Sequence, residues 1–100
     1  MPAIVRIDDT STGHGCFPPT KLVATPVTKT YINGKLAGVQ DSACQFITHA
    51  CGIQVHPQSA RYISGGASKT KIEGKPAARI GDPIACGDAC SEGSPNTFIE

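Results

Sequence analysis

The sequence is short of the residues from which hydrophobic cores are built. Its 100 residues include no tryptophan, one methionine, three phenylalanines and two tyrosines, whereas glycine (11) and proline (8) are frequent. A chain of this length buries only roughly two-thirds of the surface that it exposes when unfolded. We therefore expect a single domain, residues 1–100, that needs a covalent or metal staple, or a partner, to be stable.

Other absences exclude whole classes of protein. No apolar run approaches the roughly 18 residues of a membrane-spanning helix, and a net charge of +1 gives no electrostatic reason to bind nucleic acid. Clear helical periodicity is missing. The N-terminal residues reach the acidic pair Asp8-Asp9 at once, without a signal-peptide pattern, so we expect synthesis in a reducing cytosol.

The cysteines are five in number: Cys16, Cys44, Cys51, Cys86 and Cys90. An odd count in a chain without a secretory signal argues against a full disulfide framework. Metal ligation and plain burial are the two interpretations that remain open for each cysteine.

The chain repeats itself. Residues 30–33, 70–73 and 97–100 read Thr-Tyr-Ile-Asn, Thr-Lys-Ile-Glu and Thr-Phe-Ile-Glu, and the first two continue into Gly-Lys. Asn33-Gly34 between β-branched residues is a strong signal for a hairpin, and Glu73-Gly74 stands in the same place. The pattern predicts strands over 30–32, 70–72 and 97–99, the last without a continuation.

A second sequence element also recurs. Residues 79–82, Arg-Ile-Gly-Asp, match residues 6–9, Arg-Ile-Asp-Asp, and residues 38–41 form a degraded copy with Gly38 where arginine is expected. Loops follow Asp9, Asp41 and Asp82, whose recurrence at turns favours loop capping over a role as general base. We predict an all-β fold of three short hairpin units around a pseudo-threefold axis.

All three histidines fall in these aspartate-led loops. His14 follows Asp9, His49 and His56 lie in the long middle loop, and the third loop carries Cys86 instead. If the units surround one axis, the loops converge at one end. Three imidazoles and one thiolate form a tetrahedral set suited to Zn²⁺. Four protein ligands leave no open position, so we expect one structural zinc per chain and no enzymatic activity.

Position favours Cys86 as the sulfur ligand. It lies four residues after Asp82, much as His14 lies five after Asp9. Cys44 comes too early in its loop and Cys90 too late, and Cys16 competes only for a turn that His14 already uses. Cys51, two residues after His49, is expected to point away from it.

At this point the sequence resembles a known family. Residues 76–79 read Pro-Ala-Ala-Arg, the string that names the PAAR-repeat proteins, and residues 32–35 and 93–99 are similar to its repeats. The resemblance covers nearly the whole chain. It implies a conical cap on the trimeric β-helical spike of a contractile phage tail or a type VI secretion system, with zinc held near the apex by His14, His49, His56 and Cys86.

The resemblance also implies a partner and a place. One tip, monomeric by itself, would cap one VgrG-like or phage spike trimer, be made in the bacterial cytoplasm, and meet the target membrane only transiently. Two other hypotheses stay open. A zinc hydrolase would need an open coordination position, and a redox module would use Cys86 with Cys90, or Cys44 with Cys51, as a pair.

Overall fold

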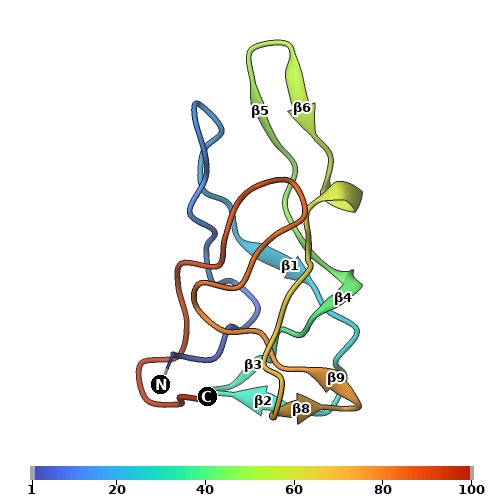
Figure 1. The fold of residues 1–100 in the computed structure, drawn as a ribbon, viewed down its shortest axis with the longest axis vertical. Helices are drawn as coiled ribbons and strands as arrows, with labels where there is room; N and C mark the ends of the chain where they lie inside the picture. The colour runs from blue at the N-terminus through green and yellow to red at the C-terminus, as the bar shows by residue number, and fades with distance from the viewer. Residues whose placement is uncertain (1, 100) are drawn as a thin grey trace.

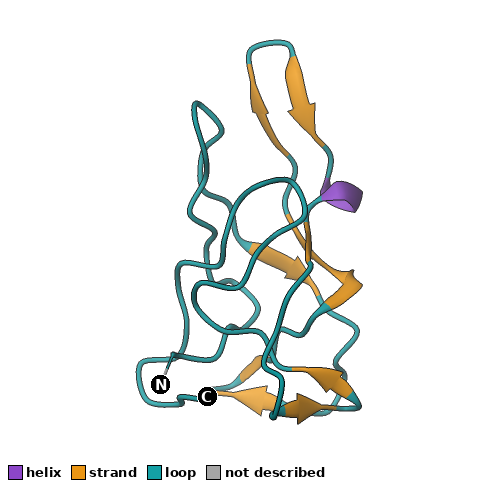
Figure 2. Ribbon diagram, viewed as in Figure 1, coloured by secondary structure: helices purple, strands orange, loops and turns teal. Residues whose placement is uncertain are grey.

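The structure is a computed structural model that describes residues 2–99. The chain is elongated, with extents of 38 × 24 × 22 Å. Loops make up much of it, and residues 2–99 contain no α-helix (Figure 2). The elements are β1 (Leu22–Ala24), β2 (Tyr31–Ile32), β3 (Lys35–Leu36), β4 (Asp41–Phe46), β5 (His49–Cys51), β6 (Gln54–His56), the 3₁₀ turn η1 (Gln58–Ala60), β7 (Tyr62–Ile63), β8 (Lys71–Ile72) and β9 (Lys75–Pro76). The all-β prediction is confirmed.

The strands form four small antiparallel sheets: β1-β4-β7, β2-β3, β5-β6 and β8-β9. The hairpins β2-β3 and β8-β9 lie at one end of the molecule together with both chain ends, and we call this end the base (Figure 1). The opposite end, the apex, carries two projecting fingers. The first finger is the loop 12–18, and the second finger is the β5-β6 hairpin.

The two hairpins at the base form as their turns predict. Asn33 and Gly34 have φ of 56° and 80°, and Glu73 and Gly74 have φ of 52° and 84°. Two consecutive positive φ values define the type I′ turn, whose twist suits antiparallel strands. Glycine and asparagine adopt this conformation readily. Glu73 does not, but its carboxylate is used elsewhere, as described below.

A third hairpin is assembled from the two ends of the chain. Ala3 pairs with Phe98, and the backbone N–H of Ile99 donates to the carbonyl of Pro2 at 2.9 Å. Each hairpin is closed by an equivalent hydrogen bond: Ile4 to Thr97, Ala37 to Thr30 and Ala77 to Thr70, at 2.9–3.0 Å. The predicted strand at 97–99 is therefore only a bridge, and the N-terminal segment supplies the continuation that the sequence did not show.

The three units meet in a closed ring of hydrogen bonds. Val5 donates its N–H to Ala78, Ala78 to Gly38, and Gly38 back to Val5, at 2.8–3.0 Å. All three residues are buried. The β-bridges on either side of the ring relate the three units in the same cyclic order. In each, the residue before a ring residue pairs with the residue after a ring residue of another unit: Ile4 with Arg79, Ala37 with Arg6 and Ala77 with Val39. This cyclic pattern is the predicted pseudo-threefold axis.

The same register corrects the predicted alignment of the middle unit. Val39, and not Gly38, occupies the position of Arg6 and Arg79. The residue three further on, which is aspartate in the other two units, is Ser42, so Asp41 is not their equivalent. The error arose because Asp41 offered the only acidic residue nearby, and the sequence contains nothing that fixes the register to a single residue.

The aspartates of the outer units do cap their turns. Asp9 accepts the backbone N–H of Arg6 at 2.8 Å and pairs with its guanidinium at 2.8 Å, and Asp82 does the same for Arg79. In the middle unit the sulfur of Cys44 receives the corresponding N–H, that of Val39, at 3.5 Å. Asp41 instead caps Ala43 and pairs with Lys75. Loop capping is thus confirmed for all three predicted aspartates, although Asp41 caps a different position from Asp9 and Asp82.

The core is small and lies between the base and the fingers. Its largest apolar members are Phe46, Leu22 and Ile63, all fully buried, and the thiols of Cys44 and Cys90 are buried among them. Arg61 is also completely buried and is larger than any of these. A fully buried cation must be hydrogen-bonded, and the partners of Arg61 belong to the site described next.

Candidate metal centre

The first finger places His14 in a tight turn between two glycines. His14 and Phe17 exchange backbone hydrogen bonds at 2.8 and 3.1 Å. Gly13 and Gly15 on either side have φ of 70° and 55°. A Cβ atom on Gly13 would lie 2.6 Å from the carbonyl oxygen of Phe17, closer than any real contact. The expected tight turn around this histidine is confirmed.

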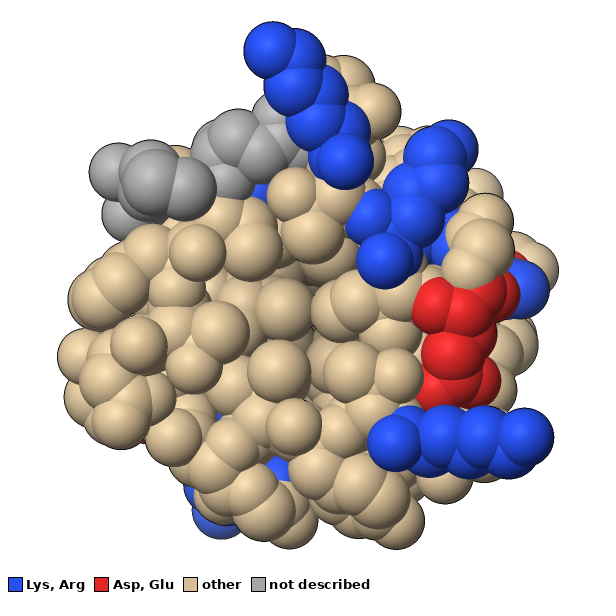
Figure 3. Space-filling model, turned by 90° about the horizontal axis from the view of Figure 1, so that it is seen from below, with Lys and Arg blue, Asp and Glu red and all other residues tan. Residues whose placement is uncertain are grey.

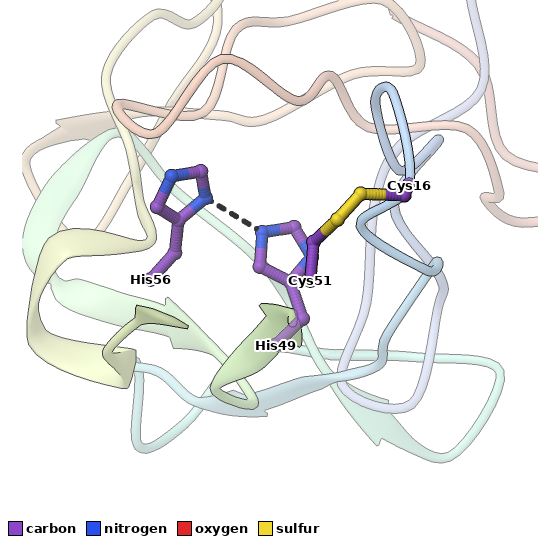
Figure 4. The surroundings of a disulfide bond; sticks show 4 residues. All are labelled: Cys16, His49, Cys51 and His56. Carbon is purple, nitrogen blue, oxygen red and sulfur yellow. Dashed lines mark hydrogen bonds between the residues drawn. A yellow bond between two sulfur atoms is a disulfide. The ribbon is translucent and has the colours of Figure 1, made fainter. Parts of the chain in front are cut away.

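The second finger brings the other two histidines together. His49 on β5 and His56 on β6 are directly opposite in the antiparallel register, so their side chains share one face. His49 is only 3% exposed. Its Nε2 lies 2.9 Å from Nδ1 of His56, the contact drawn in Figure 4.

The third loop adds the sulfur. Cys86 lies in a turn closed by the N–H of Gly87 donating to Ile84 at 3.0 Å. Its Sγ is 3.9 Å from Nε2 of His49. One ligand-type atom from each of four side chains lies within 4.8 Å of all the others: His14, His49, His56 and Cys86. The structure brings together all four residues that the sequence predicted.

These separations are close to those of a tetrahedral metal site, which small shifts of the side chains would complete. With zinc bonds of about 2.0–2.1 Å to nitrogen and about 2.3 Å to sulfur, neighbouring ligand atoms stand roughly 3.3–3.7 Å apart. The measured 2.9 Å and 3.9 Å lie on either side of that range. Imidazole and thiolate are also the donor types that zinc prefers.

Hydrogen bonds decide which ring nitrogens face the centre. Nδ1 of His14 contacts Oδ1 of Asp88, and Nδ1 of His49 lies 3.0 Å from the carbonyl oxygen of Pro18. Each of these histidines therefore keeps Nε2 for the centre, whereas His56 offers Nδ1. Partners of this kind fix the tautomer and the orientation of metal-binding imidazoles.

Asp88 was not predicted, although it lies two residues from Cys86. Its side chain is fully buried between His14 and Arg61. Burial alone would raise the pKa of Asp88. Hydrogen bonds from His14 and Ser11 and the charge of Arg61 outweigh that effect and hold the pKa below its usual value. The carboxylate is thus ionised where it orients His14.

The environment of His56 favours its neutral form. Loss of solvent contact and the neighbouring rings of His49 and His14 lower the pKa of His56. The ring of Phe17 stacks on it with centroids 4.0 Å apart and an interplanar angle of 12°. A neutral imidazole is the form that binds a metal ion.

The remaining cysteines correct two expectations. Cys16 and Cys51 form a disulfide that joins the two fingers (Figure 4). The interpretation that considered only metal ligation and burial was therefore wrong for this pair. Cys51 also does not point away from His49 by strand alternation, because residues two apart in a strand share a face. Cys44 and Cys90 are buried, as expected, and burial raises the pKa of both thiols.

Comparison with known proteins agrees with this architecture. Three hairpin units, a ring of hydrogen bonds about one axis and a His₃Cys cluster at one end define a small all-β cap. A family model described as the PAAR motif matches residues 12–91, and the chain belongs to that family. The comparison with curated proteins found no significant match. The family is structural rather than enzymatic, and membership supports a place at the tip of a contractile injection system.

The structure also bears on membrane spans. Within residues 2–99, no helix has the length and apolar character needed to cross a bilayer.

Proposed function

We propose that this protein is the structural, membrane-piercing tip that caps the trimeric β-helical spike of a phage tail or a type VI secretion system. The observation that carries the proposal is the ring formed by Val5, Gly38 and Ala78. One chain with three equivalent units can present the same backbone geometry to each chain of a trimer. It would be made in the bacterial cytoplasm as a monomer and carried outward on the spike.

The base has the features that such docking requires. Tyr31, Lys71 and Phe98 occupy equivalent places on the three hairpins, and the two aromatic side chains are 61% and 51% exposed. Seen from below, the middle of the base is uncharged, and charged side chains lie toward its edge (Figure 3). Exposed aromatic residues on an uncharged surface are typical of interface anchors.

The docking proposal is tested by stoichiometry. We expect one chain to bind one trimer of a VgrG-like or phage spike protein, measured as the mass of the co-eluting complex. A Tyr31→Lys/Phe98→Lys variant should lose the complex, whereas Ile53→Lys at the apex should keep it. A ratio of three tips to three spike chains would contradict the proposal.

The apex suits transient passage through a membrane. None of the charged residues of the sequence falls within 10–20 or 42–60, the segments that contain the two fingers. A charged side chain at the centre of a bilayer costs about 2.5–3.5 kcal/mol or more. At the tip of the second finger Ile53 is fully exposed, and Val55 is 55% exposed. An apolar, uncharged point lowers the cost of entering hydrocarbon.

Residues of the apex would hold one structural zinc per chain. The ligand-type atoms of His14, His49, His56 and Cys86 lie within 4.8 Å of one another. Four protein ligands would complete a tetrahedral coordination shell and leave no position for a substrate. Elemental analysis of protein purified without added metal should give about one equivalent of zinc. A folded protein that retains no transition metal would contradict this assignment.

A redox module has less support. It needs a thiol pair that opens and closes, but Cys51 is bonded to Cys16 and not to Cys44. Cys90, the proposed partner of Cys86, is 1% exposed, and its raised pKa disfavours the thiolate that exchange requires.

A further inference from the structure

Arg61 has surroundings that no other arginine of the chain shares. Its side chain is completely buried, and its guanidinium carbon lies 5.7 Å from the centre of the Phe46 ring. Arg6 and Arg79 each pair with an aspartate three residues away in sequence. Arg6 also contacts Asn33 and Gly93, and Arg79 also contacts Gly66. The partners of Arg61 come from three separate loops.

The guanidinium contacts every loop that carries a predicted metal ligand. From the loop of His14 it reaches the hydroxyls of Ser11 and Thr20. From the segment leading to His49 it reaches the carbonyl oxygen of Ile47. From the loop of Cys86 it reaches Sγ of Cys86 at 3.3 Å and Oδ2 of Asp88 at 2.5 Å. These contacts use all three of its nitrogens.

The backbone of Arg61 is fixed as well. Its N–H donates to the carbonyl oxygen of Gln58, the first residue of η1, and its own carbonyl oxygen accepts from the N–H of Phe46 in β4. The side chain therefore extends from a backbone that hydrogen bonds hold in place on both sides. A planar fork with five donors can bridge several acceptors at defined angles, which a lysine ammonium cannot do.

We propose that Arg61 is the positioning residue of the metal centre: it holds the three ligand-bearing loops together before metal binds and donates a hydrogen bond to the sulfur ligand. This inference rests on the proposed metal site. Because the contacts of Arg61 involve only protein atoms, they do not depend on an ion. The apex would then be organised in the metal-free chain, and the ligands would need little movement to bind.

The contact with sulfur has a separate consequence. A hydrogen bond to a metal-bound thiolate withdraws electron density from the sulfur and tunes the metal. With Co²⁺ as the probe, losing that bond raises the energy of the sulfur electrons. The sulfur-to-cobalt charge-transfer band should then move to longer wavelength. A residue that merely supported the fold would not shift this band.

The test compares Arg61→Lys with Arg6→Lys. Both changes keep the charge and remove the guanidinium from a buried Arg–Asp pair. Arg61 also bonds the predicted ligand Cys86, whereas the other partners of Arg6 are Asn33 and Gly93. We expect Arg61→Lys to bind Co²⁺ about 10–100-fold more weakly, as loss of a supporting partner typically does, and to red-shift the charge-transfer band. Arg6→Lys should match the wild type in both. Equal affinity and an unshifted band in Arg61→Lys would overturn the proposal.

A second measurement needs no variant. In wild-type protein stripped by a chelator, the backbone amides of Ile47 and Ala85, which donate to Lys21 and Tyr62, should remain protected from hydrogen exchange. Exchange at the unprotected rate would show that the loops are not held without metal, and would also overturn the proposal. Failure of wild-type protein to bind Co²⁺ at all would instead reject the metal site itself.

Discussion

At the scale of single residues, Cys86 differs from the other four cysteines in what surrounds its sulfur. It is half-buried beside three imidazoles and a guanidinium, whereas Cys44 and Cys90 lie in the apolar core. Cys16 and Cys51 are bonded to each other. Only one sulfur is therefore both near the histidines and free to bind a metal.

We predict that Cys86→Ser lowers zinc affinity more than about 100-fold, since losing a ligand exceeds the effect of losing a supporting partner. Stability should fall with it, because metal binding and folding are coupled. Zinc retention against a chelator measures the effect, with Cys90→Ser as the control that keeps its metal. If Cys86→Ser kept zinc while another cysteine variant lost it, the ligand set would be wrong.

The sequence predicted the four clustered side chains but neither Arg61 nor Asp88. The ligands were visible because they recur in corresponding loops of a repeat. Arg61 has no counterpart in the other units, and its partners lie 14 to 50 residues away in sequence. A lone arginine after a long loop is ordinarily solvated, so no local pattern marks it as buried.

At the scale of elements, the two fingers are joined twice, once by the disulfide and once by the predicted metal ligands. Cys16 and His14 belong to the first finger, and Cys51, His49 and His56 to the second. The disulfide alone, or the metal ligands alone, would close the same loop of the unfolded chain. The stabilisation from the disulfide and that from the metal should therefore be less than additive.

We predict that Cys16→Ser/Cys51→Ser lowers the free energy of unfolding by up to about 4 kcal/mol in metal-free protein, from closure of a loop with a sequence separation of 35. The loss should be clearly smaller in zinc-loaded protein. Urea unfolding of both forms measures it. Equal losses would show that metal and disulfide stabilise the chain independently.

A second link joins neighbouring hairpins at the base. The carboxylate of Glu73, in the β8-β9 turn, accepts hydrogen bonds from the backbone of Thr28 and Lys29 and from the hydroxyl of Thr30. The bond from Lys29 contributes most to lowering the pKa of Glu73. This contact explains why a glutamate occupies a turn position that favours asparagine.

We predict that Glu73→Gln destabilises the protein at neutral pH and that this deficit disappears in acid. Because the folded-state pKa is depressed, the contribution of Glu73 is present above its ordinary value of 4.5 and is lost as the pH falls through the folded value. Urea unfolding of metal-free protein, from about pH 7 to about pH 3, measures it. Asp8→Asn, which also neutralises a carboxylate at an exposed position, is the control for loss of charge. A Glu73→Gln deficit that persisted in acid would exclude the carboxylate as its cause.

The hairpins were predictable and the central sheet was not. Asn33-Gly34 and Glu73-Gly74 are local sequence signals that predict their turns. Strand β4 contains Asp41, Ser42 and Gln45 and pairs with irregular register on both sides. Alternation of apolar and polar residues, on which strand prediction depends, is therefore disrupted there.

At the scale of the whole molecule, the fold closes on itself through its ends. The chain leaves the third hairpin at residue 99 and re-enters it at residue 2, so opening the backbone at another hairpin turn instead would leave the ring intact. Connectivity at the other two hairpin turns is equivalent.

We predict that a circular permutant, with residues 99 and 2 joined through Glu-Gly and new ends between Asn33 and Gly34, folds and binds zinc. Its unfolding midpoint should fall by no more than about 8 °C, the equivalent of roughly 1 kcal/mol in a domain of this size. Calorimetry measures the midpoint. The matched permutant opened between Gly38 and Val39, within the ring, should not fold. If the two permutants were equally stable, the ring of hydrogen bonds would not be needed for folding.

The docking that we propose would also give the complex a statistical property, which follows from the symmetry of the partner. On a partner with true threefold symmetry, rotation of this chain by one-third of a turn gives an arrangement of identical energy, although Tyr31, Lys71 and Phe98 exchange places. The three orientations together contribute RT ln 3, about 0.65 kcal/mol, to the free energy of docking. In a population of particles the disulfide-linked fingers would point along three azimuths with equal frequency. Threefold averaging of images would blur the apex, and sorting particles by the β5-β6 hairpin would recover three equal classes.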